Sequence, residues 1–118
     1  MAEITISGNT HPFFLGYSAL KLMADKHGKS PTQIADAIAQ MDVQTIAQLL
    51  QVGLSRGASA NGLNPAQFTE DFCEAALDAQ PQLIGVVSME YGNQVATMFE
   101  AVNDWATKNA LAAGKAAK

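Results

Sequence analysis

The feature that most constrains the fold of this 118-residue chain is a strand pattern found once, at residues 3–15, ahead of helical patterns. Residues 3–7 read Glu-Ile-Thr-Ile-Ser, so two isoleucines share one face of a strand. Gly8-Asn9 can supply the positive φ of a tight turn, and residues 10–15 can return as an edge strand containing Pro12. Two strands are too few to be stable alone in water, so this hairpin must pack on the following helices or on another molecule.

The rest of the chain has apolar residues at intervals of three and four, which predicts a mainly α-helical fold of about five helices. Ser30-Pro31, Asp42 and Asn64-Pro65 are start signals, because Ser, Asp and Asn cap helix N-termini and Pro fits the first turn. Gly28 and Gly57 are expected to end the first and third helices.

The last helix is expected to run from Pro81 to about Asn109. A stripe of apolar residues along it is spaced four, three, four, three, as in a short coiled-coil seam: Tyr91, Val95, Met98, Val102 and Trp105. Gly85 and Gly92-Asn93 weaken the helix, which predicts a kink or break near Gly92. We therefore expect one helical domain, residues 1–109, with its hairpin at 3–15, followed by a flexible Ala/Lys tail at 110–118.

Composition and charge exclude several classes of function. The formal net charge is −4, whereas a nucleic-acid footprint needs a basic face. The single Cys73 cannot form an internal disulfide, and we expect neither a signal peptide nor a membrane span, because the apolar runs are short. A cytoplasmic protein is the default. Only 15% of residues are charged, and such a mild surface suits association with other proteins.

The sequence offers little for catalysis. His11 and His27 lie sixteen residues apart without ligand spacing, and His27 is better explained as a helix-terminal cation or a polar surface residue. Carboxylates near Cys73 would raise the thiol pKa, which is the wrong direction for a nucleophile. The acidic residues 70, 74 and 78 share a helix face, either solvated or used by a partner. No phosphate-binding loop or Gly-x-Ser-x-Gly motif occurs, so we expect no catalytic, cofactor or metal residues and no enzyme.

The functional expectation is instead a set of apolar contacts with other proteins. The residues chosen for these contacts are Phe13, Phe14, Tyr17, Tyr91, Met98 and Trp105. Two alternatives stay open at this point. Trp105 can fold back on the domain or anchor a partner, and the hairpin can pack within the chain or against a neighbouring subunit.

Five stretches, taken in order, resemble one protein family. They are Glu-Ile-Thr-Ile-Ser-Gly-Asn-Thr at 3–10, Phe-Phe-Leu-Gly-Tyr-Ser-Ala-Leu at 13–20, Lys-His-Gly-Lys-Ser at 26–30, Asp-Val-Gln-Thr-Ile-Ala-Gln-Leu-Leu at 42–50 and Gly-Leu-Ser-Arg-Gly at 53–57. This order is similar to that of the tail assembly chaperones of long-tailed bacteriophages and related prophages. The resemblance covers residues 3–80 and rests on order and spacing rather than on a chemical signature. The segment 81–109 departs from the family's pattern.

The resemblance implies a small, non-enzymatic, mostly helical protein in the host cytoplasm that is absent from the mature virion. Such chaperones coat the tape measure protein, hand it over to the tail tube protein, and in some cases self-associate or occur in a longer, frameshifted form. Two alternatives remain: a structural tail or head-completion protein retained in the virion, and a small bacterial helical interaction or regulatory module.

Overall fold

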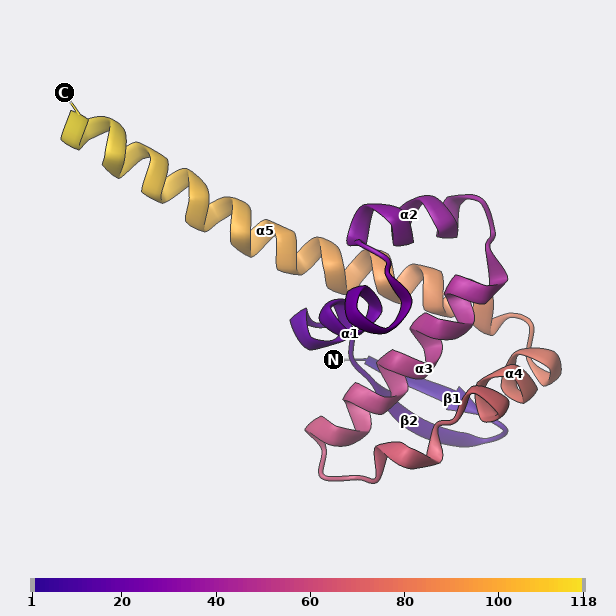
Figure 1. Ribbon diagram of the computed structural model, residues 1–118. Helices are drawn as coiled ribbons and strands as arrows, with labels where there is room; N and C mark the ends of the chain where they lie inside the picture. The colour runs from indigo at the N-terminus through magenta and orange to yellow at the C-terminus, as the bar shows by residue number, and fades with distance from the viewer. Residues whose placement is uncertain (1, 118) are drawn as a thin grey trace.

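Figure 1 shows the computed structural model, which describes the backbone of residues 2–117 and the side chains of residues 2–109. Within these residues the fold is mainly α-helical and begins with a two-stranded antiparallel hairpin, as the sequence predicts. The elements in chain order are β1 (Ala2–Ile6), β2 (Asn9–Phe13), α1 (Tyr17–His27), α2 (Pro31–Ala39), α3 (Val43–Ala60), the 3₁₀ helix η1 (Pro65–Gln67), α4 (Glu70–Ala79) and α5 (Leu83–Ala117).

The hairpin turn lies one residue earlier than the sequence predicts. Ile6 pairs with Asn9, so the two turn residues are Ser7 and Gly8 rather than Gly8 and Asn9. Both have positive φ, 51° and 81°, as a tight hairpin turn with two central residues requires. Ser7 is held in this conformation from outside the hairpin, because its N–H donates to Oε1 of Gln80 at 2.6 Å. Gln80 lies 73 residues further along the chain, where no local pattern can signal the contact.

The hairpin packs on its own chain, against α3. Two glycines one turn apart on α3 make this close approach possible. A Cβ on Gly57 would lie less than 3.0 Å from the carbonyl oxygen of Pro12, and a Cβ on Gly53 would overlap the ring of Phe13. The N–H of Phe14 donates to the carbonyl oxygen of Gly53 at 3.0 Å, so the strand lies directly on the helix backbone. Gly57 is therefore a packing residue and does not end α3, which continues to Ala60.

The predicted helix starts are confirmed at two places and corrected at a third. Ser30 caps α2 in a complete capping box with Gln33, and Asp42 caps α3. Asn64-Pro65, in contrast, starts only η1, and α4 begins later with Thr69 as its cap. The interruption lets Phe68 turn into the core, where it is buried.

The last helix, α5, is longer and more regular than predicted. It starts at Leu83 and runs without a break through Gly92 to Ala117. Its first half packs on the body, whereas every side chain from Phe99 to Asn109 is exposed. Figure 1 shows this second half projecting away from the body, and we call it the arm. The tail predicted at 110–118 continues the backbone of α5 as far as Ala117, whereas its side chains and Lys118 lie outside the described residues, so its flexibility stays a prediction.

No helix in the part of the chain that the structure describes combines the length and the apolar character needed to cross a bilayer.

Candidate functional site: an apolar surface along α5

Two of the six predicted contact residues are core residues. Phe13 is fully buried, because its ring occupies the space left by the missing side chain of Gly53. Tyr91 is also buried, and its hydroxyl donates to the carbonyl oxygen of Pro31 at 2.8 Å, which joins α5 to the start of α2. Neither side chain presents surface to a partner in this structure, so the contact prediction for Phe13 and Tyr91 is corrected.

Three other predicted residues meet in one groove, although about 80 residues separate them along the chain. Phe14, from the segment between β2 and α1, and Tyr17, the first residue of α1, lie beside Met98 of α5 around a groove of about 490 Å³. Tyr17 lies at the edge of the groove and is 75% exposed, and Met98 is half-buried. We call this the root groove, because it lies where the arm leaves the body. The polar side chains that complete its lining are Asn93, Gln94 and Thr97.

One glutamine holds the root groove together. Oε1 of Gln94 accepts from the N–H of Leu15 at 2.8 Å, and its Nε2 donates to Oε2 of Glu90 at 3.0 Å. This ties the segment between β2 and α1 to α5. Gly16 leaves room for the ring of Phe14 there, because a Cβ would overlap that ring unless it moved. The groove is therefore held by contacts between distant parts of the chain, with the ring of Phe14 in its wall.

The arm carries the same apolar seam beyond the body. The inner half of the seam, at Tyr91 and Val95, is buried in the core. The outer half is exposed, with Trp105 66% exposed at its far end. We call the three exposed residues Phe99, Val102 and Trp105 the distal stripe. Phe99 is the one member that the seam spacing misses, although it lies three residues before Val102. Phe99 is 44% exposed and lines a smaller groove with Pro31 and Ala35 of α2, whereas Trp105, at 66%, does not fold back on the domain.

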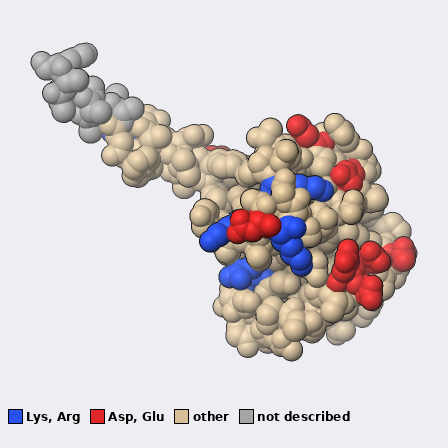
Figure 2. Space-filling model, in the orientation of Figure 1, with Lys and Arg blue, Asp and Glu red and all other residues tan. Residues whose placement is uncertain are grey.

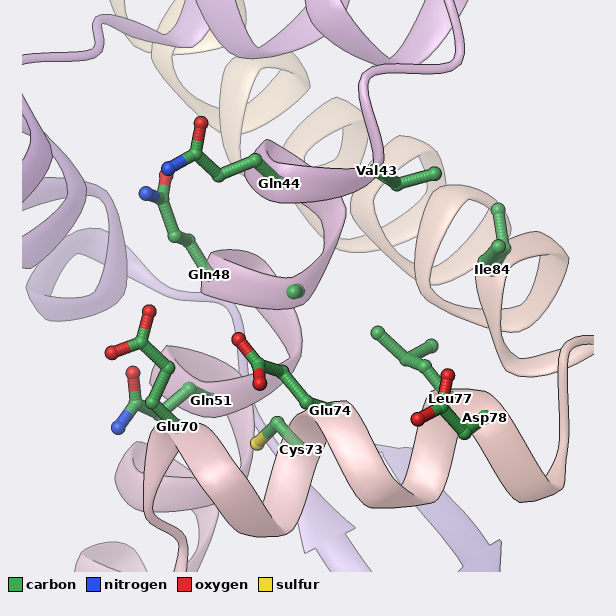
Figure 3. Close-up of a pocket in the computed structure, with 11 residues that line it drawn as sticks. Val43, Gln44, Gln48, Gln51, Glu70, Cys73, Glu74, Leu77, Asp78 and Ile84 are labelled. Atoms are coloured by element: carbon green, nitrogen blue, oxygen red, sulfur yellow. The ribbon is translucent and has the colours of Figure 1, made fainter.

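A second groove, of about 520 Å³, lies between α3 and α4 (Figure 3). The wall from α4 carries the carboxylates of Glu70, Glu74 and Asp78, which therefore line a groove rather than only a solvated face. Figure 2 shows acidic residues gathered on the side of the body where α4 lies, away from the arm. We call this the acidic groove. Glutamines line its α3 wall, and its apolar end consists of Val43, Leu77 and Ile84.

Burial shifts the pKa values of two titratable groups of the body, Cys73 and His27. Burial, followed by the charges of Glu70 and Glu74, raises the pKa of the Cys73 thiol to about 12, in the direction that the sequence predicts. Burial lowers the pKa of His27, and Lys26 and Lys29 lower it further. His27 is thus less suited to be a helix-terminal cation than predicted. Among the described side chains, no three potential metal ligands cluster.

Cys73 gives a testable consequence of this burial. We expect native protein at pH 8 to react with iodoacetamide only as fast as the fold opens, because the protonated, buried thiol is a poor nucleophile. Protein in denaturant should react at the rate of an ordinary cysteine. Alkylation of the native chain as fast as of the unfolded chain, followed by mass spectrometry, would contradict the placement of Cys73 beneath the acidic groove.

Comparisons with known protein families, with curated proteins and with solved structures find no match to this chain.

Proposed function

We propose that this chain is a non-enzymatic tail assembly chaperone of a long-tailed bacteriophage. In this function it binds the tape measure protein, helps to recruit the tail tube protein, and associates with itself. It acts in the cytoplasm of the host bacterium and leaves before the virion is mature. The observation that carries the proposal is the apolar seam of α5, whose inner half holds the fold and whose outer half is exposed on a projecting helix.

The proposal is supported by the kind of surface that such a protein needs. A chaperone of a long helical protein requires apolar contacts that form and release, and a helix with an exposed apolar stripe pairs readily with another helix. Methionine and aromatic side chains beside the arm, at Met98 and Tyr17, can adapt to different partner residues. The root groove and the distal stripe are neighbours along α5, so one partner helix can contact both.

Trp105 should be a main anchor of the partner. We expect Trp105→Ala to weaken binding of the tape measure protein by about 2 kcal/mol, roughly thirty-fold in Kd, because exposed tryptophans that become buried dominate interface energies. Tyr17→Ala should act in the same direction through the root groove. The free energy of unfolding should change by no more than about 0.5 kcal/mol for Trp105→Ala, since its side chain is largely exposed on the projecting arm.

Met89→Ala is the matched control. Met89 is also on α5 and is 57% exposed, but it lies outside both the root groove and the distal stripe. Titration calorimetry should give the same affinity for Met89→Ala as for the unchanged chain. Equal affinities for Trp105→Ala and Met89→Ala would remove the distal stripe from the partner interface.

The two alternative functions separate in simple experiments. A structural tail or head-completion protein would be found in purified virions by mass spectrometry, whereas a chaperone should be missing. A bacterial regulatory module would fail to bind a tape measure protein, and its gene would have no tape-measure gene immediately downstream.

A further inference from the structure

The single Asn-Gly pair of the chain, Asn61-Gly62, lies in the exposed turn that follows α3. An asparagine in this position can react with its own backbone, because a following glycine has no Cβ to hinder the peptide nitrogen that joins the two residues. Every other asparagine in the chain precedes a residue with a side chain. The pair is therefore the place in this sequence where such a reaction is fastest.

The turn requires the glycine for a structural reason. Gly62 has a φ of +70°, and its N–H donates to the carbonyl oxygen of Ser59 at 3.3 Å. The N–H of Leu63 donates to the carbonyl oxygen of Ala58 at 2.8 Å. These two bonds form a Schellman motif, whose left-handed position favours glycine at the end of a helix. The motif that ends α3 thus places the unhindered nitrogen next to Asn61.

The same motif prevents the reaction while it is closed. The ψ of Asn61 is 13°, which turns the nitrogen of Gly62 away from the asparagine side chain. Nδ2 of Asn61 donates to the carbonyl oxygen of Gly57 at 2.8 Å, so the side chain is held over the last turn of α3. Bringing the two groups together requires rotation about the Cα–C bond, which breaks the bond to Ser59. A hydrogen bond of 3.3 Å is a weak one, and helix ends open more readily than helix centres.

We propose that Asn61 is a site of spontaneous covalent modification, controlled by opening of the last turn of α3. In the open turn, the nitrogen of Gly62 gives its proton to hydroxide and attacks Cγ of Asn61. A new C–N bond forms, the bond from Cγ to Nδ2 breaks, and Nδ2 takes a proton from water and leaves as ammonia. A second water molecule opens the succinimide ring at either carbonyl carbon. The product is aspartate when the side-chain bond is hydrolysed and isoaspartate when the main-chain bond is hydrolysed.

Either product weakens the end of α3. A carboxylate at position 61 cannot donate to the carbonyl oxygen of Gly57, and it adds negative charge at a helix C-terminus, where the dipole opposes it. Isoaspartate also lengthens the backbone by one carbon, which displaces the N–H groups of Gly62 and Leu63 from their acceptors. Gly57 is the residue against which the carbonyl of Pro12 packs. The modification therefore acts on the helix turn that supports the hairpin, and it does not depend on the proposed function.

The first test measures conversion residue by residue. The chain is incubated in mildly alkaline buffer, digested, and analysed by mass spectrometry. In denaturant, Asn61 should convert faster than Asn103, which precedes Asp104. In native buffer, Asn61 should convert at least about tenfold more slowly than in denaturant, because only the open turn reacts. Asn61→Gln is the control, since the larger ring that glutamine has to form closes far more slowly, and it should show no conversion at this position.

The second test measures the effect of the product on the fold. Asn61→Asp reproduces the product with a normal backbone and should lower the Tm. Asn64→Asp is the matched control, because it adds the same charge three residues later. The side chain of Asn64 accepts from the N–H of Ala66 at 3.0 Å, and a carboxylate can accept the same bond. Asn64→Asp should therefore keep the Tm of the unchanged chain.

Three results would overturn the proposal. Conversion of Asn61 in native buffer as fast as in denaturant would show that the closed turn gives no control. Equal conversion of Asn61 and Asn103 in denaturant would remove Asn61 as a distinct site. Equal Tm values for Asn61→Asp and Asn64→Asp would show that the modification leaves the end of α3 unchanged.

Discussion

Replacing Phe13 by Ala should lower the free energy of unfolding by about 4 kcal/mol, because a fully buried phenylalanine that is truncated leaves a cavity the fold cannot close. The cavity would open between the hairpin and Gly53 of α3, where the backbone of both elements is already in contact. Such a loss is a large part of the total stability of a domain this size. Denaturant unfolding monitored by circular dichroism measures it.

The neighbouring phenylalanine provides the control for this prediction. Phe14 has the same side chain one residue later, but it lies in the wall of the root groove and is only half-buried. We expect Phe14→Ala to cost about 1 kcal/mol of stability, well below the loss for Phe13. Equal losses for the two substitutions would mean that the hairpin does not present Phe13 to the core.

Replacing Gly57 by Ala should destabilise the fold by about 3 kcal/mol, at the upper end of the range for overpacking. The added methyl group would overlap the carbonyl of Pro12, which belongs to the backbone of β2 and cannot rotate away as a side chain can. Either the strand moves off α3 or the helix bends, and both outcomes loosen the contact that supports the hairpin. Thermal unfolding should show a markedly lower Tm.

Gly92→Ala is the matched control for Gly57→Ala. Gly92 is also inside a helix, but a Cβ there would have no atom within 4 Å. Alanine favours the helix over glycine by about 1 kcal/mol, so Gly92→Ala should stabilise the protein slightly. The same substitution is therefore expected to lower the free energy of unfolding at Gly57 and to raise it at Gly92. A neutral Gly57→Ala would contradict the close packing of the hairpin on α3.

Local sequence signals predict much of this fold because the interactions behind them are local. Ser30 with Gln33 forms its capping box within one turn, and Gly28 adopts the left-handed conformation that ends α1. The alternating pattern of residues 3–7 places Ile4 and Ile6 on one face of β1, and that face is buried as predicted. Such features need only a few neighbouring residues to specify them.

The features that the sequence places wrongly, the hairpin turn and the end of α3, depend on contacts between residues that are distant in the chain. The turn at Ser7 is held by Gln80, and Gly57 is kept free of a side chain by Pro12, so neither has a signal within its own segment. A shift of one residue in a strand exchanges its two faces, which is why the choice between Phe13 and Phe14 needs the true register.

The candidate site is predictable in part for the same reason. The seam spacing identifies the apolar face of α5, but it cannot tell where the body stops covering that face. Val95 is buried and Trp105 is exposed, although both follow the same spacing. The meeting of Phe14 with Met98 in the root groove is likewise invisible before the fold is known.

The central claim is that the outer half of the α5 seam serves other chains. Its most direct test is the emission of Trp105, the single tryptophan, in a dilute solution of the chain as the tape measure protein is added. We expect the free chain to emit as a hydrated indole and the complex to emit at shorter wavelength, with saturation at a defined ratio. A free chain that already emits as a buried indole, or a complex that forms without any shift, would contradict the claim.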